Sequence, residues 1–90
     1  MSDETVSAGP DGLQVTVLLF AALREQLGEP QVERRVPTGI TARALYESMF
    51  PATSAGRMPV MFAVDEVYAA PETVLHDGAT VAFLPPLGGG

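Results

Sequence analysis

The residues of this 90-residue chain that could do chemistry lie at its C-terminus, which reads VAFLPPLGGG over residues 81–90. The apolar run predicts a buried strand. Pro85 and Pro86 end this strand because proline lacks the backbone N–H that strand pairing needs. Beyond Leu87 the three glycines carry no side chain, so this backbone could enter a channel that a Cβ would block. We therefore expect the tail to present one chemical group, the carboxylate of Gly90.

A carboxylate is a poor electrophile, so this chemistry requires a partner that activates Gly90 with ATP. The resulting acyl-adenylate could be attacked by a persulfide of the partner, which would leave Gly90 as a thiocarboxylate. Gly88 and Gly89 would let the tail pass to the reacting centre, and none of the three glycines can act as an acid, a base or a metal ligand. We expect the catalytic residues on the partners and no tightly bound cofactor on this chain. The alternative is that the glycines are only a frayed chain end.

Composition excludes several other classes of site. The chain has no cysteine, so it can form no disulfide, no thiolate metal site and no cysteine nucleophile. Its single histidine, His76, has no second histidine or cysteine to share a metal with, so we expect it to be a solvated loop residue. A net charge of −6 disfavours nucleic acid and favours a basic partner surface. No apolar run of about 18 residues predicts a membrane span. We therefore expect a soluble, cytoplasmic protein.

The elements that must position the tail are predicted from hydrophobic periodicity. Residues 1–12 are expected to form a flexible extension, residues 13–87 one α+β domain, and residues 88–90 the reactive tail. The expected strands are 15–20, 31–36, 60–64, 67–69 and 80–84, and the expected helices are 21–27 and 42–50. Thr41 is a candidate N-cap, Gly28 a candidate helix stop, and Asp65 with Glu66 a solvated turn. The strand at 31–36 suits a sheet edge because Arg34 shares a face with Val32 and Val36.

Three stretches in order carry a resemblance to a known family. They are the opening stretch VTVLLFAALRE at 15–25, a middle stretch that contains FAVDEVY at 62–68 and LHDGATV at 75–81, and the tail FLPPLGGG at 83–90. Over about residues 14–90 the chain resembles the small subunit of molybdopterin synthase, a branch of the ubiquitin-like sulfur carriers. Two departures lie in turns. Asp65 stands where the family usually has asparagine, and Ala79 where it usually has a second acidic residue.

The resemblance implies a ubiquitin-like β-grasp fold, with a mixed sheet packed on one main helix. It also implies two partners: a ubiquitin-activating-like adenylyltransferase, and the large catalytic subunit of molybdopterin synthase in a heterotetramer. The carrier would donate sulfur to a cyclic pyranopterin precursor. A sister carrier for thiamine or cysteine biosynthesis, a protein modifier, and a plain interaction module with an inert tail remain as alternatives. The double proline before the glycines favours the small subunit of molybdopterin synthase over thiamine-type carriers.

Strand alternation also predicts a partner-binding surface. Phe20 and Leu84 point away from the core residues beside them, and Tyr68 matches an apolar position of the family's partner-binding surface. These three residues are expected to form an exposed patch that continues into Pro85, Pro86 and Leu87. The alternative is that a second layer of the same domain covers them. Met61 is expected to be core or loop filler.

Overall fold

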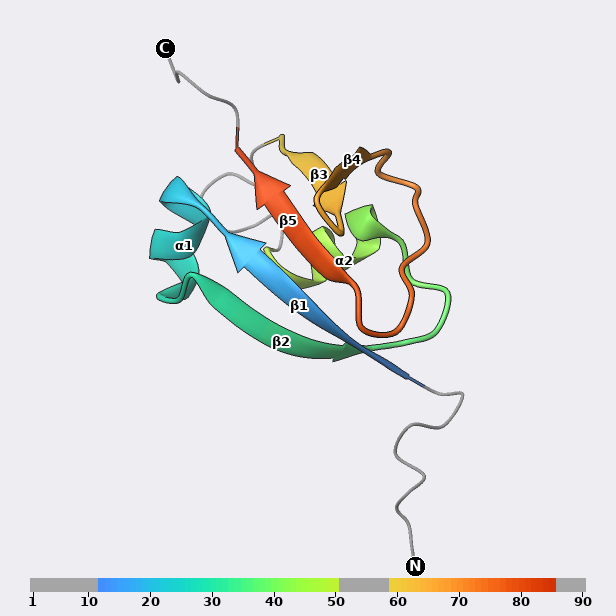
Figure 1. The fold of residues 1–90 in the computed structure, drawn as a ribbon. Helices are drawn as coiled ribbons and strands as arrows, with labels where there is room; N and C mark the ends of the chain where they lie inside the picture. Colours follow the sequence, from blue (N-terminus) through green and yellow to red (C-terminus); the bar gives the residue numbers. More distant parts are fainter. Residues whose placement is uncertain (1–11, 51–58, 86–90) are drawn as a thin grey trace, which may run out of the picture.

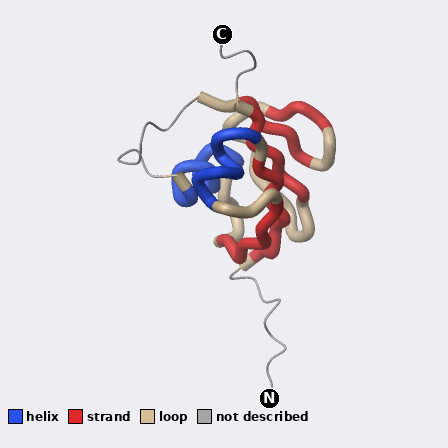
Figure 2. The backbone as a smooth tube through the Cα atoms, turned by 90° about the vertical axis from the view of Figure 1, so that its left-hand side faces the viewer, coloured by secondary structure: helices blue, strands red, loops and turns tan. Residues whose placement is uncertain are grey.

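The computed structural model describes residues 12–50 and 59–85, which form one five-stranded sheet and two helices. In chain order the elements are β1 (Leu13–Leu19), α1 (Ala21–Leu27), β2 (Gln31–Val36), α2 (Ala42–Met49), β3 (Met61–Val64), β4 (Val67–Ala69) and β5 (Thr80–Leu84). Both helices lie on the same side of the sheet (Figure 1, Figure 2). No helix of the described residues covers the other side.

The strand order is β2-β1-β5-β3-β4. β1 and β5 pair in parallel at the centre of the sheet, whereas β1 with β2, β3 with β5, and β3 with β4 pair antiparallel. This mixed sheet packed on α2 is the β-grasp arrangement that the resemblance implied. The expected edge position of β2 is confirmed. Because β1 and β5 are parallel, their C-terminal ends lie at the same end of the molecule (Figure 1).

Four elements have the expected bounds, and three differ by one or two residues. β1 begins at Leu13 rather than at residue 15 because Leu13 pairs with Val36, the last residue of β2. It ends at Leu19, and Phe20 becomes the N-cap of α1 with an extended backbone. α2 ends at Met49 with Phe50 as its C-cap, and β3 begins at Met61 rather than at residue 60.

The helix ends follow the capping residues. The Thr41 Oγ1 accepts a hydrogen bond from the Ala44 N–H at 3.1 Å, which satisfies one of the free donors at the start of α2. Gly28 ends α1 with φ of 85°, a left-handed conformation in which a Cβ would be strained. Both capping predictions are confirmed.

The core forms between α2 and the inner face of the sheet. The spacing of apolar residues in α2 predicts that Leu45 is buried with Val17, Leu19 and Phe83. Leu45 has no exposed surface and belongs to one cluster with these residues, so this prediction is confirmed. Met49 follows Leu45 by four residues, and this helical spacing predicts that Met49 is buried in the same core, but it is only partly buried. The ring of Phe50, at the C-cap, occupies the core instead, with its centroid 6.3 Å from that of Phe83.

Replacing Leu45 by Ala is expected to lower the free energy of unfolding by about 2–5 kcal/mol, because the side chain leaves a cavity that the sheet cannot fill. Urea denaturation of the two proteins measures this difference. Glu25→Ala on the exposed side of α1 is the control, with an expected change within about 0.5 kcal/mol. An equal effect of both substitutions would show that α2 does not pack as described.

Candidate functional site

The outer face of the sheet carries a row of side chains from four strands. Residues paired across a sheet point to the same face. Leu18 pairs with Ala82, Ala82 with Ala63, and Ala63 with Tyr68. The two alanines therefore form a low floor between the larger side chains of Leu18 and Tyr68.

A second row lies nearer the C-terminal end of β5. In this row Met61 pairs with Leu84. Phe20 follows Leu19 and Leu84 follows Phe83, and because Leu19 pairs with Phe83 and Phe20 keeps an extended backbone, Phe20 comes to lie beside Leu84. The exposed fractions are 43% for Phe20, 58% for Met61 and 70% for Tyr68, and Leu84 is partly exposed. We call the two rows together the outer apolar face: Leu18, Phe20, Met61, Ala63, Tyr68, Ala82 and Leu84.

The outer apolar face contains the three residues that the sequence placed in a patch. By strand pairing and alternation, Phe20, Tyr68 and Leu84 face the side of the sheet on which no described helix lies. Phe20 makes no side-chain cap for α1, although it occupies the N-cap position where Ser, Thr, Asp or Asn is favoured. Its residue type is thus not explained by helix capping. Its partner-binding role stays a prediction.

Met61 is a member of this face that the sequence analysis missed. It is neither core nor loop filler, because its side chain points outward beside Leu84. The pattern that could have found it is the alternation of β3. Phe62 is buried in the core, so the residue before it must face outward.

Two shallow hollows, of about 340 and 250 Å³, indent this face. They share Ala63, Ala82 and Glu66, and the larger also touches Leu18, Asp65 and Thr80. The smaller extends to Tyr68 and Leu84. The Asp65-Glu66 turn therefore borders the outer apolar face instead of lying apart from it.

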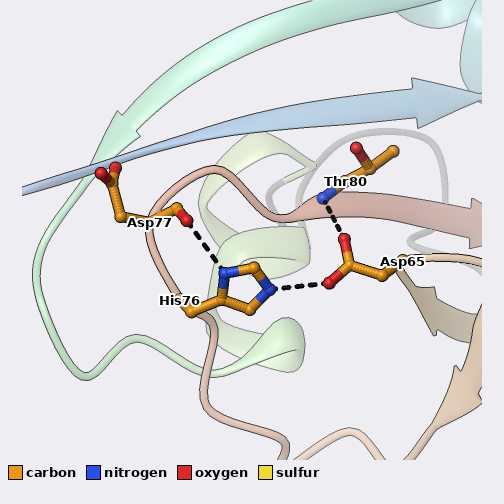
Figure 3. Close-up of polar contacts among 4 residues, drawn as sticks. All are labelled: Asp65, His76, Asp77 and Thr80. Atoms are coloured by element: carbon orange, nitrogen blue, oxygen red, sulfur yellow. Dashed lines mark hydrogen bonds and ion pairs between the residues drawn. The ribbon is translucent and has the colours of Figure 1, made fainter.

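The turn between β3 and β4 is tied to β5 by hydrogen bonds. Asp65 and Glu66 both have left-handed backbones, with φ of 53° and 73°, where asparagine and glycine are favoured. The Asp65 N–H donates to the Thr80 carbonyl at 2.8 Å. The Thr80 N–H donates to the Asp65 Oδ1 at 3.0 Å (Figure 3). The Asp65 carboxylate thus accepts a hydrogen bond from the Thr80 backbone N–H, and the side-chain oxygen of an asparagine at this position could accept the same bond.

His76 completes this cluster from the loop before β5. Its Nε2 lies 2.7 Å from the Asp65 Oδ2, and its Nδ1 lies 2.9 Å from the Asp77 carbonyl oxygen (Figure 3). The ring is exposed, as expected, but it is paired with Asp65 rather than simply solvated. The two predictions of a solvated turn and a solvated histidine were therefore incomplete.

The pKa of Asp65 is lowered and the pKa of His76 is raised, so both shifts favour the charged forms of the two groups. The Thr80 N–H, followed by the His76 ring, lowers the pKa of Asp65. The bond to Asp65, followed by the bond to the Asp77 carbonyl, raises the pKa of His76. When His76 is protonated, both of its ring N–H groups have an acceptor, so the charged form is the one that this site favours.

Neither a metal centre nor a membrane span is found in the described part of the chain. Residues 12–50 and 59–85 contain no group of three or more His, Asp or Glu side chains that could hold a metal ion. None of the helices among these residues has the length and apolarity needed to cross a bilayer.

The glycine tail lies outside the described residues, as do Pro86 and Leu87. Pro85 is the last described residue, and it follows directly on Leu84 of the outer apolar face. The point from which the tail departs is therefore the end of β5, which lies beside the C-terminal end of β1 (Figure 1). The roles expected for Gly88, Gly89 and Gly90 stay predictions.

The model of the ThiS family matches residues 17–90. The chain belongs to the ThiS family. The matched stretch runs from Val17 of β1 to the terminal glycines, and it includes the outer apolar face and the Asp65-Glu66 turn. The family resemblance that the three sequence stretches indicated is confirmed.

Two curated relatives of this ThiS-family chain carry the same name, molybdopterin synthase sulfur carrier subunit. The protein from Arabidopsis thaliana is 30% identical over 92 aligned residues, which cover 99% of this chain and 91% of the relative. The protein from Mycobacterium tuberculosis is 35% identical over 82 residues, which cover 87% of this chain and 99% of the relative.

Solved structures confirm the ubiquitin-like β-grasp fold of this ThiS-family chain. A Pyrococcus furiosus protein assigned as molybdopterin converting factor, subunit 1, has a TM-score of 0.71 at 26% identity, and the match covers 83% of this chain and 99% of that one. The small archaeal modifier protein SAMP1 from Haloferax volcanii has a TM-score of 0.69 at 22% identity, with 86% and 99% coverage. At that identity the second match shows the fold alone.

The pair of Asp65 and His76 predicts a pH dependence of stability. The lowered pKa of Asp65 contributes stability above the ordinary carboxyl value of 3.8, which is lost as the pH falls through the folded-state pKa. The raised pKa of His76 contributes stability below 6.5, which is lost as the pH rises through its folded-state value. The pair should therefore stabilise the fold most between these two values.

His76 is the single histidine of the chain, so NMR can follow its titration without overlap. We expect its pKa above 6.5, and Asp65→Asn should lower it because the negative partner is lost while an acceptor for the Thr80 N–H is kept. Glu72→Gln, a charge change at a residue that pairs with Arg43 instead, is the control. A His76 pKa that is the same in the wild type and in Asp65→Asn would contradict the pairing.

Proposed function

We propose that this chain is the sulfur carrier subunit of a molybdopterin synthase and that Gly90 carries the sulfur as a thiocarboxylate. The observation that carries the proposal is that two curated relatives, each matched over most of its length, bear this name. The glycine tail of this chain supports the same chemistry, because a backbone carboxylate without neighbouring side chains can be presented inside an active site.

The proposed reaction has two partners. On a ubiquitin-activating-like adenylyltransferase, the Gly90 carboxylate attacks the α-phosphate of ATP and pyrophosphate leaves. A persulfide then attacks the acyl-adenylate and AMP leaves, after which a thiol cleaves the S–S bond and frees the thiocarboxylate. On the large synthase subunit, in a heterotetramer, the thiocarboxylate sulfur bonds to a cyclic pyranopterin precursor. Water then cleaves the acyl–sulfur bond, which leaves the sulfur on the pterin and returns Gly90 to the carboxylate. The chain itself contributes binding and presentation, and catalytic groups belong to its partners.

The outer apolar face is the proposed docking surface for these partners. The tail departs from Pro85, next to Leu84, so a partner that takes the tail into its active site must cover this end of the sheet. Phe20 and Met61 expose apolar surface at this end and Tyr68 exposes more in the neighbouring row, and burying this surface would favour association.

Replacing Leu84 by Asp is expected to weaken binding to the large synthase subunit of the same organism by about 30-fold or more, because a carboxylate would be desolvated at the centre of an apolar interface. Isothermal titration calorimetry measures the affinity, and thermal unfolding checks the fold. The matched control is Val74→Asp, at a residue that is 60% exposed and is bridged to Thr41 at the start of α2. Equal affinities of the two variants would exclude this docking surface.

Deleting Gly90 is expected to abolish thiocarboxylate formation, although Gly88 and Gly89 would still end the chain. One residue moves the reacting carbon by about 3.3 Å, which is as large as the reacting distance itself. Intact mass spectrometry after incubation with the adenylyltransferase, ATP and a persulfide donor would detect the exchange of one oxygen for sulfur. Thermal stability should not change.

Normal sulfur loading of the chain that ends at Gly89 would contradict the requirement that the tail has this exact length. A thiocarboxylate would also form on a carrier for thiamine or cysteine biosynthesis, so the loaded wild-type protein is then mixed with the large subunit and the pyranopterin precursor. Molybdopterin is the expected product. Loading without molybdopterin formation would favour a sister pathway.

A further inference from the structure

Glu66 lies in the β3–β4 turn at the border of the outer apolar face, and the following inference rests on the docking role proposed for that face. Glu66 lines both hollows, together with Ala63 and Ala82. Leu18 borders the first hollow, and Tyr68 and Leu84 border the second. Glu66 thus adjoins apolar side chains in both hollows.

Glu66 differs from its neighbour Asp65 in having no partner. Both oxygens of Asp65 accept hydrogen bonds, from Thr80 and His76. No hydrogen bond or ion pair joins Glu66 to any other residue in the described ranges. In the free protein, water alone therefore solvates this carboxylate.

The described part of the chain offers no cation that could reach Glu66. Its arginines lie on other elements: Arg24 on α1, Arg34 and Arg35 on β2, and Arg43 on α2. β2 is the opposite edge of the sheet from β4, and Arg43 pairs with Glu72. His76 is already paired with Asp65. A countercharge for Glu66 must therefore come from outside these residues.

A partner that covers the outer apolar face removes water from Glu66. Burying an unpaired carboxylate against apolar groups is strongly unfavourable, whereas a charged hydrogen bond to a cation offsets this cost. We propose that the partner presents an arginine or lysine side chain to Glu66, with its aliphatic stem on the floor of Ala63 and Ala82. The exposed ring of Tyr68 borders the same hollow and can stack on a guanidinium group.

The net charge of −6 agrees with a basic partner surface, but Glu66 gives this general attraction a fixed position. A cation at this position would set the register of the partner on the sheet, since apolar contacts alone are not directional. Glu66 is therefore a specificity residue of the docking surface and not a catalytic residue.

The test is Glu66→Gln, which removes the charge and keeps the size of the side chain. Binding to the large synthase subunit is measured by calorimetry at low and high salt. We expect at least about a tenfold loss of affinity at low salt and a weaker salt dependence than in the wild type. Glu72→Gln makes the same change in net charge on an exposed residue whose partner is Arg43, and it should bind like the wild type.

The sign of the effect decides the inference. If the partner meets Glu66 with apolar or neutral groups, removing the carboxylate relieves its desolvation, and Glu66→Gln would bind as tightly as the wild type or tighter. That result, with Leu84→Asp still weakening binding, overturns the cation and leaves the docking surface in place. If Leu84→Asp has no effect either, the docking surface and this inference fall together, while sulfur loading of Gly90 tests the proposed function separately. Thermal unfolding of each variant excludes a folding defect as the cause.

Discussion

The parallel pairing of β1 with β5 is the constraint on which the rest of the structure depends. It places the last strand at the centre of the sheet, where Val81 and Phe83 have no exposed surface. A tail attached to an edge strand could move with a fraying edge, but Pro85 follows a strand that is hydrogen-bonded on both sides. The same pairing sets Phe20 beside Leu84. One interaction thus fixes both the root of the tail and the surface around it.

Much of this architecture could be predicted from the sequence because it depends on local rules. Period-two alternation separated the buried Val17 and Leu19 from the outward residues, and the Thr41 and Gly28 caps marked two helix ends. The parallel β1–β5 register does not follow from local periodicity, and the β-grasp topology entered through the family resemblance. The partial burial of Met49 and the full burial of Phe50 do not follow from helical spacing, because tertiary packing decides which of two neighbouring side chains fills one space in the core.

The candidate site was predicted less completely than the fold, for a physical reason. Its apolar members could be found by alternation, but its polar members meet only through long-range register. Asp65 and His76 are eleven positions apart and touch because the β3–β4 turn lies against the start of β5. Read alone, each had the sequence context of a solvated turn residue. Their pairing ties the left-handed Asp65-Glu66 turn to the loop before β5 at the border of the outer apolar face.

The fixed starting point of the tail affects how the carrier passes from one partner enzyme to the next. Because the tail departs from the same end of the sheet that exposes Phe20, Met61 and Leu84, two enzymes that each receive the tail would have to occupy one overlapping footprint. The carrier could then never bridge them, and each delivery would require full release from the first enzyme before capture by the second. Very tight binding to either one would stall the cycle, so natural selection on this surface would favour rapid exchange over maximal affinity.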